Sequence, residues 1–186
     1  MHPQAPKKNK QRNTWTRIVA WLVRRRLKSV PDSPLDFIRL FHEPKDWLLV
    51  MPAQATAFDQ VLPFIMELME NLKGIRLHLL VPNDFRYWVT VTTPKLKVHP
   101  FNKQDLLLGQ FPRRSLLERL RNLKPEVAMD LCPMPTPLSL SVIGASGARV
   151  RGAISRKFGD DIFNFLVQSR AVELEDRYRA FFAYLS

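Results

Sequence analysis

The most regular pattern of hydrophobic and polar positions lies in residues 47–72. It opens with an unbroken apolar run over residues 47–51, which stands between Pro44 and Pro52. A short apolar run bounded by prolines is typical of a strand that is buried on both faces. Six small or polar residues follow, and apolar residues then recur at helical period over residues 58–72. The pattern predicts a strand, a short loop and an amphipathic helix, which together form the first half of a βαβ unit.

The rest of the chain repeats this alternation. Further short apolar runs predict strands at residues 75–81, 96–101, 127–131 and 150–154. Amphipathic or capped patterns predict helices at residues 35–41, 115–123, 138–146 and 172–185, and residues 85–91 fit either a short helix or a strand. Strands and helices that alternate at this spacing predict an α/β fold with a mainly parallel sheet and helices on both faces. We therefore expect a single Rossmann-like domain over residues 35–186, preceded by a basic N-terminal helical extension over residues 1–34.

The extension carries most of the charge of the chain. Residues 1–30 contain nine lysines and arginines and no acidic residue, and the formal net charge of the chain is +12. The remainder is nearly neutral, so we interpret the basicity as a property of the extension and not of a binding face of the domain. Residues 1–12 are polar and basic and are predicted to be disordered, and a helix is predicted from Asn13 to the linker at residues 31–34.

The predicted helix of the extension is neither a membrane span nor a signal peptide. Its longest apolar run, residues 18–23, is much shorter than the about 20 residues that cross a bilayer. Three arginines follow this run, where a signal peptide would have its cleavage region. We also expect residues 1–30 to be dispensable for folding, because a linker separates them from the alternating pattern.

A basic helix with two tryptophans is consistent with three kinds of partner. It can lie on an anionic membrane surface, or dock on a protein partner or on the chain's own domain, or serve as a nucleic-acid-binding arm. The residues expected to contact a membrane or a partner are Trp15, Arg17, Trp21, Arg24, Arg25, Arg26 and Lys28.

The composition gives little support for metal, cofactor or nucleophilic chemistry. A single cysteine excludes an internal disulfide and suits a reducing cytoplasm, and the four histidines have no metal-ligand spacing. The sequence has no nucleophile turn and no glycine-rich loop between a strand and a helix. We expect no cofactor and no metal, and a protein of the cytoplasm or the inner face of a membrane. The sequence does not identify a small-molecule ligand.

A resemblance to a known family rests on three runs in a fixed order. They are LLVMPAQATAFDQVLPFI, IRLHLLVPND and PEVAMDLCPMPTPLSLSVIGASGARVRGAI. Their order and spacing resemble the N-terminal half of glycosyltransferase family 9, the ADP-heptose:lipopolysaccharide heptosyltransferases. The counterparts of the family's later strand and of its following turn are residues 127–130 and 146–152, and the similarity covers residues 47–185.

Two departures from the family change what the resemblance implies. The Gly-Asp pair that ends the first loop of the family is Phe58-Asp59 here. The resemblance implies that Asp59 is the base that deprotonates an acceptor hydroxyl. From the residues alone, Asp59 is instead a carboxylate in a first helical turn, favoured there by the helix dipole. Family members also have a C-terminal half that binds the nucleotide sugar, and this sequence stops where that half would begin.

The function expected from these departures is a non-catalytic binding or scaffolding module with a protein partner. One alternative is an active glycosyltransferase for hexosyl or heptosyl transfer, with Asp59 as base and a donor-binding half from a partner chain. A second alternative is a nucleic-acid-binding protein that works through its basic tail. Ligands of open α/β sheets lie at the carboxyl ends of the strands. We therefore expect a crevice beside the loop at residues 52–59, formed by Gln54, Thr56, Asp130, Arg149 and Arg151.

Overall fold

The computed structural model describes residues 14, 17–19, 21–23, 46–72, 74–154 and 162–185. Several predictions fall outside these residues, namely the helix at 35–41, the linker at 31–34, and the partner contacts expected of Trp15, Arg24, Arg25, Arg26 and Lys28.

The centre of the described part is a six-stranded sheet in the order β3-β2-β1-β6-β7-β8, in which every neighbouring pair is parallel. The strands are β1 (Asp46–Val50), β2 (Arg76–Pro82), β3 (Leu96–Phe101), β6 (Val127–Asp130), β7 (Val150–Ile154) and β8 (Phe165–Val167). Strand β1 therefore lies inside the sheet, as its unbroken apolar run predicts. The α/β fold class with a parallel sheet is confirmed.

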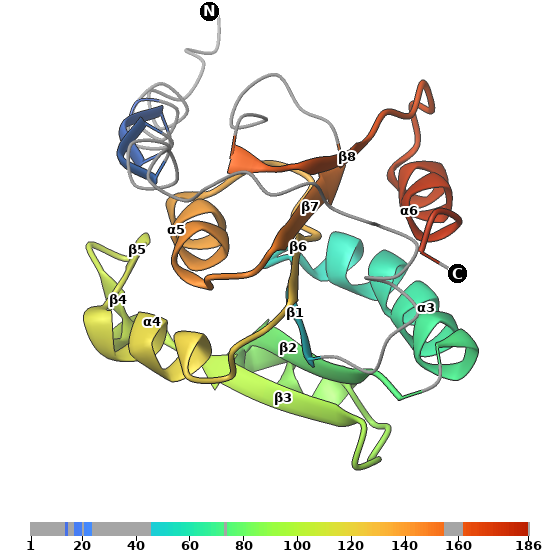
Figure 1. The fold of residues 1–186 in the computed structure, drawn as a ribbon, viewed down its shortest axis with the longest axis horizontal. Coiled ribbons are helices and arrows are strands. Elements are labelled where there is room, and N and C mark those ends of the chain that lie inside the picture. The colour runs from blue at the N-terminus through green and yellow to red at the C-terminus, as the bar shows by residue number, and fades with distance from the viewer. Residues whose placement is uncertain are drawn as a thin grey trace, which may run out of the picture.

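Helices cover both faces of the sheet (Figure 1). On one face lie α3 (Ala55–Asn71) and α6 (Leu174–Phe182), and on the other lie α4 (Arg114–Arg121) and α5 (Pro137–Ala145). Successive side chains of a strand point to opposite faces, so β1 contributes to two cores. Trp47 and Leu49 pack with α3 and α6, whereas Leu48 and Val50 pack with α4 and α5.

Local chemistry explains why α5 begins where it does. The side chain of Thr136 accepts a hydrogen bond from the Ser139 backbone N–H at 3.0 Å, and the Thr136 N–H donates to the Ser139 hydroxyl at the same distance. Pro137 occupies the first helical position, where a missing N–H costs no helical hydrogen bond.

The short elements are those that the periodicity does not predict. The ambiguous residues 85–91 contain most of a 3-10 helix, η1 (Asn83–Trp88), and another 3-10 helix, η2, covers Lys103–Asp105. Between η2 and α4 lies a hairpin of two-residue strands, β4 (Leu106–Leu107) and β5 (Phe111–Pro112). Strands of two or three residues, including β8, are too short to show an alternating pattern.

The described helical residues near the N-terminus dock on the chain's own domain, one of the three alternatives that the sequence left open. Val19 and Val23 are only 5% and 9% exposed and share a core with Leu140 and Ile143 of α5. A Cβ atom on Gly144 would lie 2.2 Å from Cγ1 of Val23, so the contact depends on a glycine at this position. The expectation that residues 1–30 are dispensable for folding does not fit this packing, because two of them belong to the core.

No helix in the described residues is long and apolar enough to cross a membrane.

Candidate functional site

The strand order creates a switch point beside β1. The chain places β2 and β3 on one side of β1 and then places β6, β7 and β8 on the other. The loops that follow β1 and β6 therefore diverge, and ligands of open α/β sheets bind at such a point. A hollow of about 40 Å³ lies there. Its lining residues are Val50, Met51, Ala53, Gln54, Phe101, Cys132, Met134, Thr136 and Leu138.

Hydrogen bonds hold the loop after β6 against β1. The Leu131 N–H donates to the Val50 carbonyl at 3.0 Å, and the Cys132 thiol donates to the Met51 carbonyl at 3.6 Å. From α6, the hydroxyl of the fully buried Tyr178 donates to the Leu131 carbonyl at 2.7 Å. Hydrogen bonds to the end of β1 and from α6 therefore hold this wall of the crevice in place.

The two aspartates of interest occupy very different environments. Asp130 is 0% exposed, and its carboxylate accepts a hydrogen bond from the Cys132 N–H at 3.0 Å. Asp59 is exposed and belongs to α3, which begins at Ala55. The first turn of this helix contains no acidic residue, so Asp59 lies beyond it. The prediction that Asp59 lies in the first helical turn is therefore wrong, and the dipole effect there is weaker. Within the described part of the chain, Asp59 makes no ion pair or side-chain hydrogen bond.

The remaining residues of the predicted crevice do not form one group. Gln54 and Thr56 are exposed at the start of α3, next to the hollow. Arg149 directly precedes β7 and Arg151 is its second residue, so both lie toward the amino ends of the strands. Arg151 donates to the carbonyls of Ile162 and Ala148 at 2.9 and 3.2 Å. These bonds connect β7 to the segments that precede and follow it.

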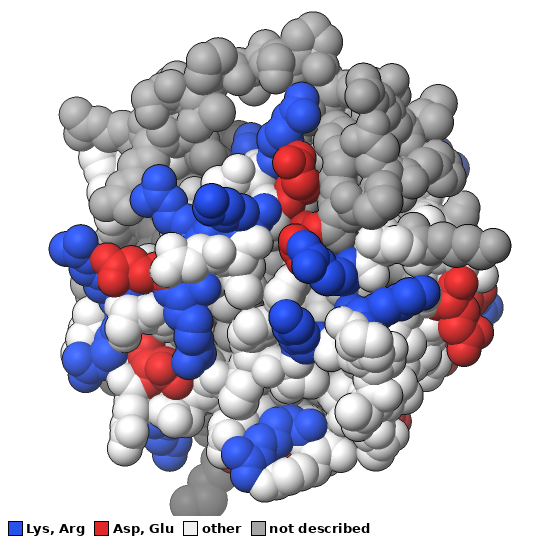
Figure 2. Space-filling view, turned by 60° about the horizontal axis from the view of Figure 1, so that its bottom comes forward, with Lys and Arg blue, Asp and Glu red and all other residues white. Residues whose placement is uncertain are grey.

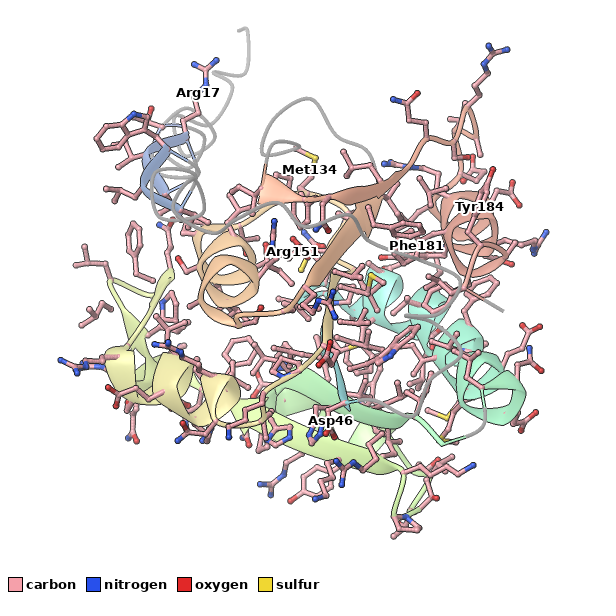
Figure 3. The ribbon with its side chains drawn as sticks, in the orientation of Figure 1. Arg17, Asp46, Met134, Arg151, Phe181 and Tyr184 are labelled. Atoms are coloured by element: carbon pink, nitrogen blue, oxygen red, sulfur yellow. The ribbon has the colours of Figure 1, made fainter. Side chains whose placement is uncertain are left out.

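Figure 3 labels Arg151, Met134 and Arg17. Arg17 points away from the domain, and Met134 lies far from Asp46 in this view. Trp21, the other described member of the predicted partner surface, is 58% exposed.

A polar cluster that the sequence analysis did not predict lies on β1, β2 and β3. His78 is buried, and its Nε2 lies 2.9 Å from Oδ1 of Asp46 while its Nδ1 lies 2.9 Å from Nε2 of His99. Arg76 donates to the other carboxylate oxygen of Asp46 at 2.5 Å. These residues are far apart in sequence, and only the strand register brings them onto one face. A structural role fits His78, because both of its ring nitrogens have partners.

Burial and charge shift two pKa values in this cluster. Burial, together with electrostatic interactions with His78, Arg119 and Lys97, lowers the pKa of His99 to about 4. Burial alone would raise the pKa of Asp46, but hydrogen bonds and charge from Arg76 and His78 hold that pKa below its ordinary value. The described residues contain no group of three or more His, Cys, Asp or Glu side chains that could hold a metal ion.

Comparison with known proteins adds one finding. No family model matches the chain, and no curated protein matches it. A solved structure, the crystal structure of the glycosyl transferase family 9 from Veillonella parvula DSM 2008, superposes with a TM-score of 0.54. The chain has a glycosyltransferase family 9-like fold.

The match covers 77% of this chain and 41% of the Veillonella chain at 9% sequence identity. At such identity the likeness concerns the fold alone. The predicted resemblance to glycosyltransferase family 9 is therefore confirmed for the fold, whereas its assignment to the N-terminal half stays a prediction.

Proposed function

We propose that this glycosyltransferase family 9-like domain is a non-catalytic binding or scaffolding module. The observation that carries the proposal is the small size of the hollow at the switch point. Sites for ligands of drug or cofactor size typically occupy roughly 300–1,000 Å³, whereas the hollow here is about 40 Å³. Apolar side chains such as Met51, Phe101 and Leu138 contribute much of its lining.

The environments of the Asp130 and Asp59 carboxylates also support a non-catalytic module. A general base must be oriented toward the proton that it removes, and neighbouring groups usually provide that orientation. The Asp130 carboxylate is buried and accepts the Cys132 N–H. Asp59 is exposed in α3, beyond the first turn, and has no orienting side chain in the described residues.

The carboxyl edge of the sheet also exposes apolar side chains that suit a protein partner. Met134 lines the crevice and is 57% exposed. Trp88, which is 41% exposed, packs its ring against Phe58 in the first turn of α3, with the ring centroids 5.8 Å apart. Tyr87 beside it is 72% exposed. Exposed aromatic and methionine side chains are enriched at protein interfaces.

The enzymatic alternative rests on the accessibility of Asp59. An exposed carboxylate next to the crevice can serve as a base if a partner chain supplies the donor-binding half. The nucleic-acid alternative rests on the nine basic residues of the extension, and it requires binding to DNA or RNA that weakens steeply with salt.

The substitution Asp59→Asn tests the proposal, because it removes charge and basicity and keeps the shape. We expect neither the parent nor the variant to release nucleotide or transfer sugar from ADP-heptose or other nucleotide sugars. Thermal midpoints should be nearly equal, since Asp59 has no partner in the described part.

The matched control is Glu67→Gln, which removes a charge from an exposed position of the same helix. Turnover by the parent that is lost in Asp59→Asn and kept in Glu67→Gln would contradict the non-catalytic proposal and favour the enzyme.

A further inference from the structure

Exposed apolar side chains gather on two segments that pack against α5. The helical residues near the N-terminus expose Ile18, Trp21 and Leu22 by 41%, 58% and 48%. The turn of the β4–β5 hairpin exposes Leu107 and Leu108 by 47% and 83%. Val23 contacts α5 at Gly144, and β5 also packs on α5, so both segments lie on the same side of the molecule (Figures 1 and 3). We call these five residues the outer apolar surface.

The orientation of the helical residues is set by packing. Val19 and Val23 are buried in the core with Leu140 of α5, and this contact fixes which side of the helix faces the domain. As a result, Trp21 and Leu22 lie on a side of the helix that faces away from the domain and are exposed. A helix at the surface of a soluble domain normally turns polar residues to water, so a second apolar side needs its own explanation.

The hairpin turn presents a leucine in an unfavourable backbone conformation. Leu108 has a φ of 51°, in the left-handed region, and Gly109 follows with a φ of 66°. This region costs a residue with a Cβ atom about 1 kcal/mol, and turns normally fill it with glycine or asparagine. Here the position holds a large apolar side chain that is 83% exposed. Its exposure does not stabilise the isolated domain, so it is an independent sign of a contact outside the domain.

We propose that the outer apolar surface inserts into the interfacial region of an anionic phospholipid bilayer, with the chain lying on the membrane and not crossing it. Tryptophan and leucine side chains are suited to this depth, about 5–10 Å into the headgroup and acyl boundary. Positive charge favours anionic lipids. Residues 1–30 carry nine basic and no acidic residues, and Lys103 and Arg113 are exposed at either end of the hairpin.

The same charge argues against a second copy of the chain as the occupant. A dimer through this surface would join two chains that each carry nine positive charges in residues 1–30, and like charges repel. The inference uses a different surface from the crevice and does not depend on the proposed function.

The test is sedimentation of the full chain with vesicles of phosphatidylcholine alone or mixed with phosphatidylglycerol. We expect binding to the anionic vesicles, weakening as NaCl rises, and little binding to the neutral ones. Trp21→Ser and Leu108→Gly should each weaken binding roughly tenfold, the effect of losing one buried apolar side chain. Leu108→Gly relieves the left-handed conformation, so its thermal midpoint should equal or exceed that of the parent.

The matched control is Val172→Ser, which removes a 92% exposed valine just before α6, on the other face of the sheet. It should bind anionic vesicles like the parent. The proposal is overturned if the parent binds neither vesicle, if it binds neutral vesicles equally well, or if Val172→Ser and Leu108→Gly behave alike. It is also overturned if sedimentation velocity shows a dimer that Leu108→Gly dissociates, because the occupant is then a second copy.

Discussion

At the scale of single residues, Tyr178 connects α6 to the wall of the crevice. Its buried hydroxyl donates to the Leu131 carbonyl at 2.7 Å. We predict that Tyr178→Phe lowers the free energy of unfolding by about 1–2 kcal/mol, because the carbonyl loses a buried donor. Urea denaturation should show a lower midpoint with an unchanged m-value. Tyr184→Phe is the control, because Tyr184 is 69% exposed, and an equal loss there would contradict the assignment.

His99 gives the chain a predictable response to acid. Its pKa is about 4 in the folded chain, against an ordinary value of 6.5. Between these values the unfolded chain binds more protons than the folded one, so the free energy of unfolding falls as the pH drops from about 6.5 to 4. The lowered pKa of Asp46 has the same sign but acts only as the pH falls below its ordinary value of 3.8.

The variant His99→Gln tests this response, because its side-chain amide can donate to or accept from His78 and does not titrate. We predict a flatter dependence of the unfolding free energy on pH between 6.5 and 4, measured by denaturant unfolding at each pH. A slope identical to that of the parent would show that His99 is not the titrating group.

At the scale of elements, the contact between α5 and the N-terminal helical residues depends on Gly144. In an exposed helix, glycine to alanine gains about 1 kcal/mol. Here the added Cβ would lie 2.2 Å from Cγ1 of Val23, so we predict that Gly144→Ala destabilises the domain by about 1–3 kcal/mol. Thermal unfolding provides the measurement. Against a Val23→Ala background the same substitution should cost much less, and stabilisation by Gly144→Ala in the parent would contradict the contact.

The elements also show what the sequence can and cannot predict. The apolar run at 47–51, bounded by prolines, identified β1 closely, since both faces of a central strand must be apolar. The hairpin at residues 106–112 has strands of two residues and no period to detect. Docking of Val19 and Val23 was not predictable from their own segment, because it depends on a glycine more than 100 residues away.

The structure brings only some of the predicted crevice residues together. The strand, loop and helix over residues 46–71 place Gln54 in the lining of the hollow and Thr56 two residues further along the chain. Arg149 and Arg151 were expected at the same crevice, yet Arg149 precedes β7 and Arg151 is its second residue, so both lie toward the amino end of the strand. The contact of His78 with His99 depends on strand register, which no local pattern specifies.

At the scale of the whole molecule, the chain after residue 30 is nearly neutral in total, but its charges are unevenly distributed. Residues 74–126 contain ten basic and four acidic residues, whereas residues 46–72 contain four acidic residues and no basic one. Figure 2 brings the side of β3 and α4 forward and shows Lys and Arg spread over it, with fewer Asp and Glu between them. The interpretation that basicity describes only the extension is therefore incomplete, because the domain has a basic side of its own.

The central position of β1 also determines when the domain can fold during synthesis. Its pairing with β2 becomes available about 30 residues after β1 is made, as Asp46 pairs with Arg76. Its other edge pairs with β6, and Trp47 faces Val127, about 80 residues later in the chain. At 5–20 residues per second a ribosome needs roughly 4–16 s for that interval. Throughout this interval one edge of β1, whose residues are apolar apart from Asp46, stays unpaired. Chaperones can bind β1 during this period, and aggregation competes with folding.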